Sequence, residues 1–393
     1  MSDKKQEKRF LGLKTFDLTV LLVVVGLVIA VAAISYMSNP ARRGKMVAYL
    51  YPASGDVPNI WLSSVENPDD ARQITFSAMG IYDFDVDGRG QRIAYSARDE
   101  ETRTLDIYLL DLTSGNARQV TFCAEEDAEC YTPVFHPTDP VIAYVRVNSN
   151  SSTNSFGTGA PRIWVLDLAT NTNRPLSQDS QLIGHSPAWS DSGNTIAYYS
   201  ADLASPGVMV YNFNPQVTET QTLNFVPTYN GSVGSLSPNG LQLVVPDIVS
   251  REQQVFTYLK LVDFSESPAT FRNFTDPNGA TDDISAQWHP DGEHVTVGRR
   301  YTDDRWTRGY QLFEIDAESG EVTTLLFDER YGHYFFAWDD SGENLLMQRL
   351  PLLNDDGTIN NLARPEIWVL EYETGNLIRI TEEAYFPRWV IPE

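Results

Sequence analysis

From residue 46 onward, short segments of alternating hydrophobic and polar residues are separated by turns, and one arrangement recurs every 47 to 54 residues. In each copy a bulky residue precedes a turn rich in Asp, Ser, Pro and Gly, and an apolar segment follows the turn. Alternation with a period of two is typical of β-strands, and Asp-Gly or Pro-Asp-Gly sequences favour tight turns. The pattern therefore predicts six hairpins, at residues 84–95, 135–144, 189–198, 236–245, 288–297 and 338–347.

Two further segments accompany the hairpins. A third alternating segment, often followed by an acidic residue and a polar turn, is found at residues 60–62, 107–109, 163–165, 208–210, 259–261, 312–314 and 367–369. A fourth, short segment ends in Thr or Ser at residues 73–75, 119–121, 175–177, 273–275 and 379–381. Four strands in a period of about 50 residues are typical of a β-propeller blade.

The two ends of the repeat complement each other. Residues 386–389 match the start of a unit but no further strands follow them, whereas residues 46–49, 60–62 and 73–75 supply three strands without the first. Pairing the two parts would hide strand edges that otherwise stay open. We therefore predict an all-β domain at residues 46–393: a seven-bladed β-propeller closed by a composite blade of one C-terminal and three N-terminal strands.

The N-terminal part contains a long apolar segment. Residues 18–37 carry no charge and can cross a membrane as a helix. We predict a transmembrane anchor there, after a cytoplasmic tail at residues 1–17 and before a linker at residues 38–45. Five basic residues precede the segment and three follow it, which favours an N-terminus inside and a propeller outside the cytoplasmic membrane. A cleaved signal peptide is the alternative, because small residues occupy positions 31–33.

The two cysteines fit an extracytoplasmic location. Cys123 and Cys130 flank a short acidic stretch in a predicted loop, where a disulfide is expected in an oxidising compartment. Two free thiols are the alternative. A metal site has less support, because no second Cys or His pair stands nearby at ligand spacing.

The charge of the chain narrows the choice of partner. The formal net charge is −24, and residues 1–45 hold eight basic and three acidic residues, so the remainder carries −29. An acidic surface repels phosphate backbones, which argues against nucleic acid as a partner. A solvated acidic exterior is the simplest explanation of the charge.

Long connections are predicted on one face of the ring. The first–second and third–fourth turns of the units are short, whereas the second–third connections at 97–105, 148–160, 299–308 and 349–365 are long. The fourth–first connections at 123–130, 276–283 and 327–332 lie on the same side. Loops elaborated on one face indicate a binding surface there, and random variation in loop length is the alternative.

A group of aromatic and His residues is expected where the innermost strands begin. Tyr131, His185, Tyr334 and Tyr385 each stand four residues before the bulky position, and His333 is beside them. A ring of such side chains at the axial mouth could stack on a peptide or a sugar. Packing of the channel wall is the alternative.

Other candidate residues have structural explanations. His136 and His289 precede Pro in the first turn of their units, so we expect them to stabilise those turns. Residues 276–283 contain three Asp residues that could bind a hard cation, although turn chemistry explains them equally well.

The repeated phrase resembles the WD40-like repeat of TolB-type β-propellers. Its features are Trp-Ser/His-Pro/Asp-Asp/Ser-Gly, then Ile-Ala-Tyr, then Ile-Trp-Val-Leu-Asp, then Leu/Ile-Thr, and it covers the chain from about residue 45. The resemblance implies an extracytoplasmic bacterial propeller that binds protein partners. TolB proteins differ in having six blades, a separate small α/β domain and a cleaved signal. Similar repeats occur in prolyl-oligopeptidase-type enzymes, whose hydrolase domain has no counterpart here.

The sequence favours a binding role over catalysis. It contains no Gly-Xaa-Ser-Xaa-Gly, phosphate-loop, His-Glu-Xaa-Xaa-His or EF-hand motif. We therefore predict a non-catalytic protein or peptide interaction module without a metal or cofactor. The alternatives are a carbohydrate-active lyase or hydrolase with its site at the axial mouth, and an envelope sensor or assembly factor with a partner in the same membrane.

Overall fold

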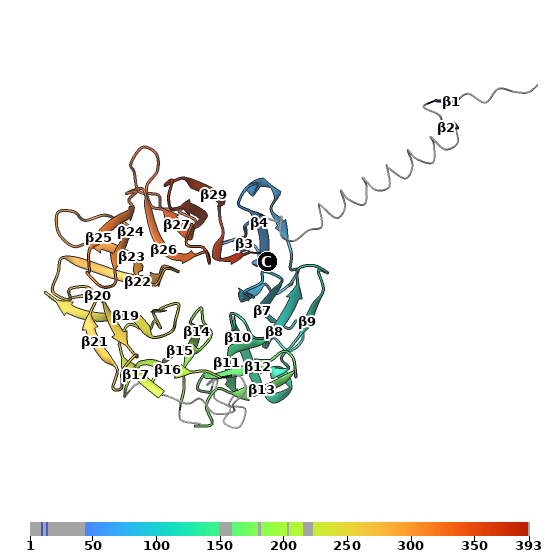
Figure 1. Cartoon of the computed structure of the whole chain (residues 1–393), viewed down its shortest axis with the longest axis horizontal. Helices are drawn as coiled ribbons and strands as arrows, with labels where there is room; N and C mark the ends of the chain where they lie inside the picture. The colour runs from blue at the N-terminus through green and yellow to red at the C-terminus, as the bar shows by residue number, and fades with distance from the viewer. Residues whose placement is uncertain are drawn as a thin grey trace, which may run out of the picture. The chain divides into compact units, whose positions relative to one another are not determined.

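A computed structural model describes residues 44–148, 159–179, 182–202, 204–214 and 223–391, and the two short paired strands β1 (Arg9–Phe10) and β2 (Leu13–Lys14). From residue 45 onward, seven four-stranded antiparallel sheets form a ring around a central axis (Figure 1). Each sheet is one blade, with its first strand innermost. The seven-bladed propeller is therefore confirmed.

Strand bounds follow the chain order. Blade 1 contains β6 (Ile81–Val86), β7 (Arg92–Arg98), β8 (Leu105–Asp111) and β9 (Ala117–Gln119). Blade 2 contains β10 (Ala128–Phe135), β11 (Val141–Asn148), β12 (Arg162–Asp167) and β13 (Thr172–Pro175). Blade 3 contains β14 (His185–Trp189), β15 (Thr195–Ser200), β16 (Gly207–Asn212) and β17 (Leu223–Pro227).

The remaining blades have the same order. Blade 4 contains β18 (Ser235–Leu236), β19 (Gln242–Arg251), β20 (Gln254–Asp263) and β21 (Thr270–Asn273). Blade 5 contains β22 (Thr281–Trp288), β23 (His294–Tyr301), β24 (Gln311–Asp316) and β25 (Val322–Leu326). Blade 6 contains β26 (Tyr331–Trp338), β27 (Asn344–Pro351), β28 (Glu366–Glu371) and β29 (Leu377–Thr381).

Blade 7 joins the two ends of the propeller. Its innermost strand is β30 (Tyr385–Val390), and β3 (Met46–Tyr51), β4 (Asn59–Ser64) and β5 (Arg72–Gln73) follow it toward the rim. β30 pairs with β3 through Met46↔Val390 and Val47↔Trp389. The composite closing blade is therefore present as predicted.

Most of the predicted N-terminal segments lie outside the described residues. This is true of the whole transmembrane anchor at 18–37 and of most of the tail at 1–17 and the linker at 38–45. Among the residues that are described, no helix has both the length and the apolar character needed to cross a membrane. The transmembrane anchor stays a prediction.

The repeated Trp residues connect neighbouring blades. The indole N–H groups of Trp189, Trp288 and Trp389 donate to main-chain carbonyls of the preceding blade's innermost strand, at 3.3, 3.1 and 3.0 Å. Trp338 instead donates to Thr296 Oγ1 at 3.1 Å. A large apolar ring with one polar atom fills the space between two sheets and satisfies a backbone acceptor, which explains why the repeat contains Trp.

The first hairpin is shifted by two residues from its predicted register. Val86 pairs with Ile93, as Trp189 pairs with Ile196 and Trp338 with Leu345. Val86, rather than Phe84, thus occupies the bulky position of blade 1. Phe84 is buried and packs edge-to-face on Phe386 of blade 7 at 5.6 Å.

The Thr that ends the fourth segment has a recurrent role. Thr75, Thr121 and Thr275 lie just beyond their outermost strands, and their hydroxyls accept hydrogen bonds from N–H groups of the third strand at 2.8 to 2.9 Å. Each hydroxyl therefore satisfies a buried backbone donor where the ladder ends.

The ring has two unequal faces. We call the side with the second–third and fourth–first connections the loop face, and the opposite side the turn face. Blade 4 adds a feature that the sequence did not predict, because β19 and β20 form a hairpin of two ten-residue strands closed by Glu252 and Gln253 in the left-handed conformation. Its tip, where Arg251 pairs with Gln254, extends the loop face.

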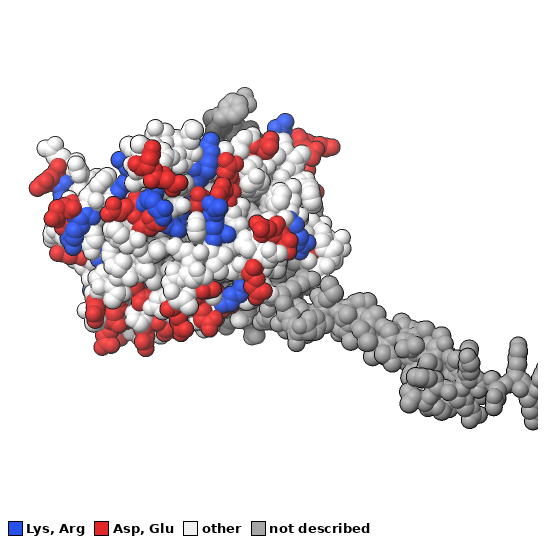
Figure 2. Space-filling view, turned by 90° about the horizontal axis from the view of Figure 1, so that it is seen from above, with Lys and Arg blue, Asp and Glu red and all other residues white. Residues whose placement is uncertain are grey.

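Acidic side chains are prominent on the surface. In Figure 2 they line the lower edge of the visible side, with few Lys or Arg among them. This distribution agrees with the negative charge of the chain outside its N-terminal segment.

Candidate functional site at the axial mouth

Five innermost strands carry an aromatic or His residue four positions before the bulky position, toward the loop face. These side chains are Tyr82, Tyr131, His185, Tyr334 and Tyr385, and we call them the mouth ring. Each lies at or beside a register shift between the first and second strands of its blade. Tyr82 and Tyr334 lie within the shift, whereas the other three are paired residues next to it. A bulge bends its strand, so each of the five groups lies where its innermost strand bends.

Contacts hold the mouth ring in place without burying it. Tyr82 is 58 % exposed and packs edge-to-face on Tyr131, with ring centroids 5.8 Å apart. Tyr334 is 40 % exposed and packs on Tyr310 at 6.1 Å. Burial lowers the pKa of His185 and raises the pKa values of Tyr131 and Tyr385, so these groups are uncharged near neutral pH. The ring thus offers aromatic faces and neutral hydrogen-bonding groups.

Tyr82 is the member that the sequence did not predict. Assigning the bulky position of blade 1 to Phe84 removed Tyr82 from the set, whereas counting four residues back from Val86 includes it. Alignment of the hairpins on their apolar second strands would have found it.

His333 occupies a different environment from the mouth ring. It is fully buried and its Nδ1 donates to the main-chain oxygen of Tyr310 at 2.9 Å. Burial, together with the nearby Arg349 cation, lowers the pKa of His333 to about 4. Since Arg349 stands directly opposite on β27 and is itself buried, His333 is part of the core of blade 6.

A charged group lies below the mouth ring. Asp85 accepts a hydrogen bond from Phe135 N at 2.8 Å and is 3.4 Å from Arg388 Nε. Asp83 accepts hydrogen bonds from the backbone N–H and the hydroxyl of Thr132. Burial raises the pKa values of Asp83 and Asp85 and lowers that of Arg388. These contacts tie blades 7, 1 and 2 together, and 18 % of the Asp85 side chain and 27 % of the Arg388 side chain stay exposed.

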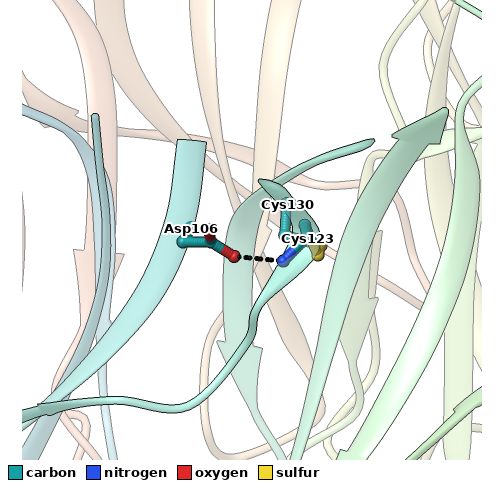
Figure 3. Close-up of side chains that lie close together, drawn as sticks. All are labelled: Asp106, Cys123 and Cys130. Carbon is teal, nitrogen blue, oxygen red and sulfur yellow. Dashed lines mark hydrogen bonds between the residues drawn. A yellow bond between two sulfur atoms is a disulfide. The ribbon is translucent and has the colours of Figure 1, made fainter. Parts of the chain in front are cut away.

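The predicted disulfide is present beside the mouth ring. Cys123, which begins the 3-10 helix η3 (Cys123–Glu126), is bonded to Cys130 of β10, the residue before Tyr131 (Figure 3). The buried Asp106 of β8 accepts hydrogen bonds from Cys123 N and Thr121 Oγ1, both at 2.7 Å. Among the described residues these three side chains form the one group with metal-ligand spacing, but the disulfide occupies both sulfur atoms.

His136 and His289 lie in turns, as expected. The Nδ1 of His136 accepts a hydrogen bond from Asp139 N at 2.9 Å, and its Nε2 lies 3.0 Å from the oxygen of Gly193 in the next blade. His289 makes the equivalent contact with Gly342 at 3.1 Å. Both side chains therefore connect neighbouring turns on the turn face.

Several clefts lie away from the axis. One of about 840 Å³ is found between blades 4 and 5 on the turn face and is lined by Asp263, Phe271, Arg272 and Asp316. We place the candidate site at the axis because the mouth ring is built by several blades at once.

Comparison with known proteins identifies the fold. No protein-family model and no curated protein matches the sequence. Among solved structures, TolB from Acinetobacter baumannii is similar with 16 % identity, a TM-score of 0.50, and coverage of 94 % of this chain and 72 % of that one. The β-propeller domain of the Trilobed protease from Pyrococcus furiosus has 12 % identity, a TM-score of 0.56, and coverage of 86 % and 95 %.

An enzyme has a similar structure as well. An oligogalacturonate lyase in complex with manganese has 12 % identity and a TM-score of 0.56, with coverage of 86 % of each chain. At such identities the likeness shows the fold and leaves the activity open. The chain therefore folds as a β-propeller similar to that of TolB.

Proposed function

We propose that this chain is a membrane-anchored, extracytoplasmic propeller that binds a protein or peptide of the cell envelope through its loop face, without catalysis. The observation that carries the proposal is the mouth ring, in which Tyr82, Tyr131, His185, Tyr334 and Tyr385 come from five blades. Tyr side chains give large contact areas at low entropic cost and are enriched at protein interfaces. The fold shared with TolB supports the same role, because the resemblance of the repeats to TolB-type propellers implies an extracytoplasmic protein that binds protein partners.

The position at which the chain enters the propeller is consistent with a binding site on the loop face. Lys45 precedes β3 and its Nζ is 2.6 Å from Asp339 Oδ2, in the first turn of blade 6. The propeller therefore begins at its turn face.

The disulfide supports an extracytoplasmic location. Disulfides persist in oxidising compartments and are rare in the cytosol. Cys123 and Cys130 are both nearly inaccessible, at 3 % and 0 % exposure, as is typical of a structural bond.

A carbohydrate-active enzyme is the second candidate, because an oligogalacturonate lyase has the same fold. Metal-assisted catalysis at the mouth needs converging His or carboxylate ligands. Among the described mouth residues, His185 is half-buried beside Ser186, whereas His333 is fully enclosed in blade 6. His185 and His333, the two His residues expected at the mouth, are not brought together, which favours binding over catalysis. A sensor or assembly factor would use the same face.

Site-specific photocrosslinking in native membranes tests the proposal. A photoreactive residue replacing Tyr82 is expected to give a discrete adduct, which is lost when Tyr131→Ala is added. The control position is Leu241, which is 46 % exposed in a turn on the opposite face. The same adducts from both positions, or an adduct that is insensitive to Tyr131→Ala, would contradict a binding site at the mouth.

A further inference from the structure

Trp306 differs from the other tryptophans of the chain. All eight are among the described residues, and Trp306 alone is exposed, at 54 %. Seven are buried or half-buried, and several of these connect blades. About half of this indole is open to solvent, so its aromatic face is available to stack on a ligand in the adjoining cleft.

Trp306 borders a cleft between blades 4 and 5 on the loop face. The cleft has a volume of about 450 Å³, and Phe256, Gln254, Asn278, Arg300 and Thr302 line it with Trp306. Its walls are the tip of the β19–β20 hairpin, the loop before β22 and the loop after β23, where blades 4 and 5 lie side by side (Figure 1). A volume of this size suits a small ligand.

Two arginines stiffen the walls of the cleft. Arg251 lies over the ring of Phe256 at 4.1 Å and its Nη2 donates to Thr281 O at 2.8 Å. Arg300 lies over the ring of Tyr310 at 4.7 Å and donates to Asp282 at 3.0 Å. Stacked and hydrogen-bonded guanidinium groups lose little further entropy when a ligand binds.

The cleft also contains polar side chains that are available to hydrogen-bond with a ligand. Within the described part of the chain, the side chains of Gln254, Asn278 and Thr302 make no hydrogen bond to other protein groups. Amide and hydroxyl groups both donate and accept, so each can pair with a ligand hydroxyl. The cleft and its immediate surroundings contain two positive side chains, Arg251 and Arg300, and two negative ones, Glu252 and Asp282, so their charges cancel.

We propose that this cleft binds an uncharged oligosaccharide, with one sugar ring stacked on the indole of Trp306. A sugar presents a flat C–H face that packs on an aromatic ring, and hydroxyls at its edge that pair with amides. Balanced charge and free amide and hydroxyl groups fit a neutral polyhydroxylated ligand better than an anion. The cleft belongs to blades 4 and 5, so the inference does not depend on the mouth ring.

Saturation-transfer NMR on the full-length protein in detergent tests the inference. The probes are maltotriose, cellotriose and tri-N-acetylchitotriose, each at millimolar concentration. At least one is expected to bind the wild type, with affinity reduced about tenfold or more by Trp306→Ala and severalfold by Asn278→Ala. Phe271→Ala is the control, because Phe271 is equally exposed, at 53 %, outside this cleft.

Three results would overturn the inference. They are no binding of any trisaccharide, binding that persists in Trp306→Ala, and binding that Phe271→Ala weakens equally. An acidic decapeptide serves as the alternative probe, and Trp306-dependent binding of this peptide without trisaccharide binding would assign the cleft to protein instead. None of these results bears on the crosslinking at Tyr82.

Discussion

At the scale of single residues, His333 is the group whose ionisation is most strongly altered. It is fully buried, stands opposite Arg349, and has a pKa lowered to about 4 from 6.5. The folded state therefore favours the neutral ring, whereas the unfolded chain takes up a proton below about pH 6.5. We expect the free energy of unfolding to fall as the pH decreases from about 6.5 to 4, by roughly 3 kcal/mol from this group.

Urea denaturation across this pH range measures the effect. The variant His333→Gln has no titrating ring, so its stability is expected to vary less with pH between 6.5 and 4, whatever its absolute value. Asp328, paired with Arg349 at 2.9 Å, is the nearby carboxylate and has a lowered pKa, so it stays ionised over this range. Equal slopes for wild type and variant would show that His333 is not the source.

Trp288 gives a second prediction at this scale. It is 2 % exposed and its Nε1 donates to Ser235 O at 3.1 Å. Trp288→Phe leaves that carbonyl without its donor and removes buried volume, so we expect a loss of about 2 to 3 kcal/mol in the free energy of unfolding. Trp306→Phe, at an exposed site, is expected to change it by less than about 0.5 kcal/mol. Chemical denaturation measures both, and equal losses would contradict the interblade role.

At the scale of elements, the disulfide fixes the segment that leads into β10. It joins two residues that are seven positions apart in the sequence and so closes a short loop. Replacing both cysteines by Ser is expected to lower the free energy of unfolding by about 2 to 3 kcal/mol, because the unfolded chain gains loop freedom. Thermal denaturation with and without reductant measures this. Reductant is expected to lower the midpoint of the wild type but not of the double variant, and alkylation of both thiols in the unreduced native protein would rule out the bond.

The elements were predictable where the repeat encodes a local rule. Turn residues and period-two alternation located the hairpins, and the Trp and Thr positions recur because each serves the same hydrogen bond in several blades. The error at Phe84 arose because blade 1 has Val86 at the bulky position, with a larger aromatic residue two positions before it. The tip residues Glu252 and Gln253 both adopt the left-handed conformation, but neither is Gly or Asn. The sequence therefore contains no turn signal from which the length of the β19–β20 hairpin could be predicted.

Side-chain surroundings were less predictable than register. Four members of the mouth ring follow from counting back from the bulky residue, but the burial of His333 depends on which neighbouring side chains cover it. The cleft beside Trp306 depends on how far two blades extend on the loop face. Neither is determined by spacing along the chain.

At the scale of the whole molecule, ring closure rests on β30. Its Val390 is buried, and Trp389 donates to Ala337 of blade 6. Deleting residues 385–393 exposes the inner edge of β3, so we expect a markedly lower and less cooperative unfolding transition, by several kcal/mol, than deletion of residues 392–393 alone. Denaturation monitored by tryptophan fluorescence compares the two. Equal midpoints would show that the ring is stable without its closing strand.

The composite blade also imposes an order in time. β3, β4 and β5 precede the other propeller strands in the chain, and β3 has no inner partner until residues 385–390 have reached the compartment in which the propeller folds. A chain interrupted at any earlier point keeps an open edge that can pair with another nascent chain. The ring can therefore close only in chains that include β30, and shorter chains keep an exposed strand edge that proteases and chaperones can bind.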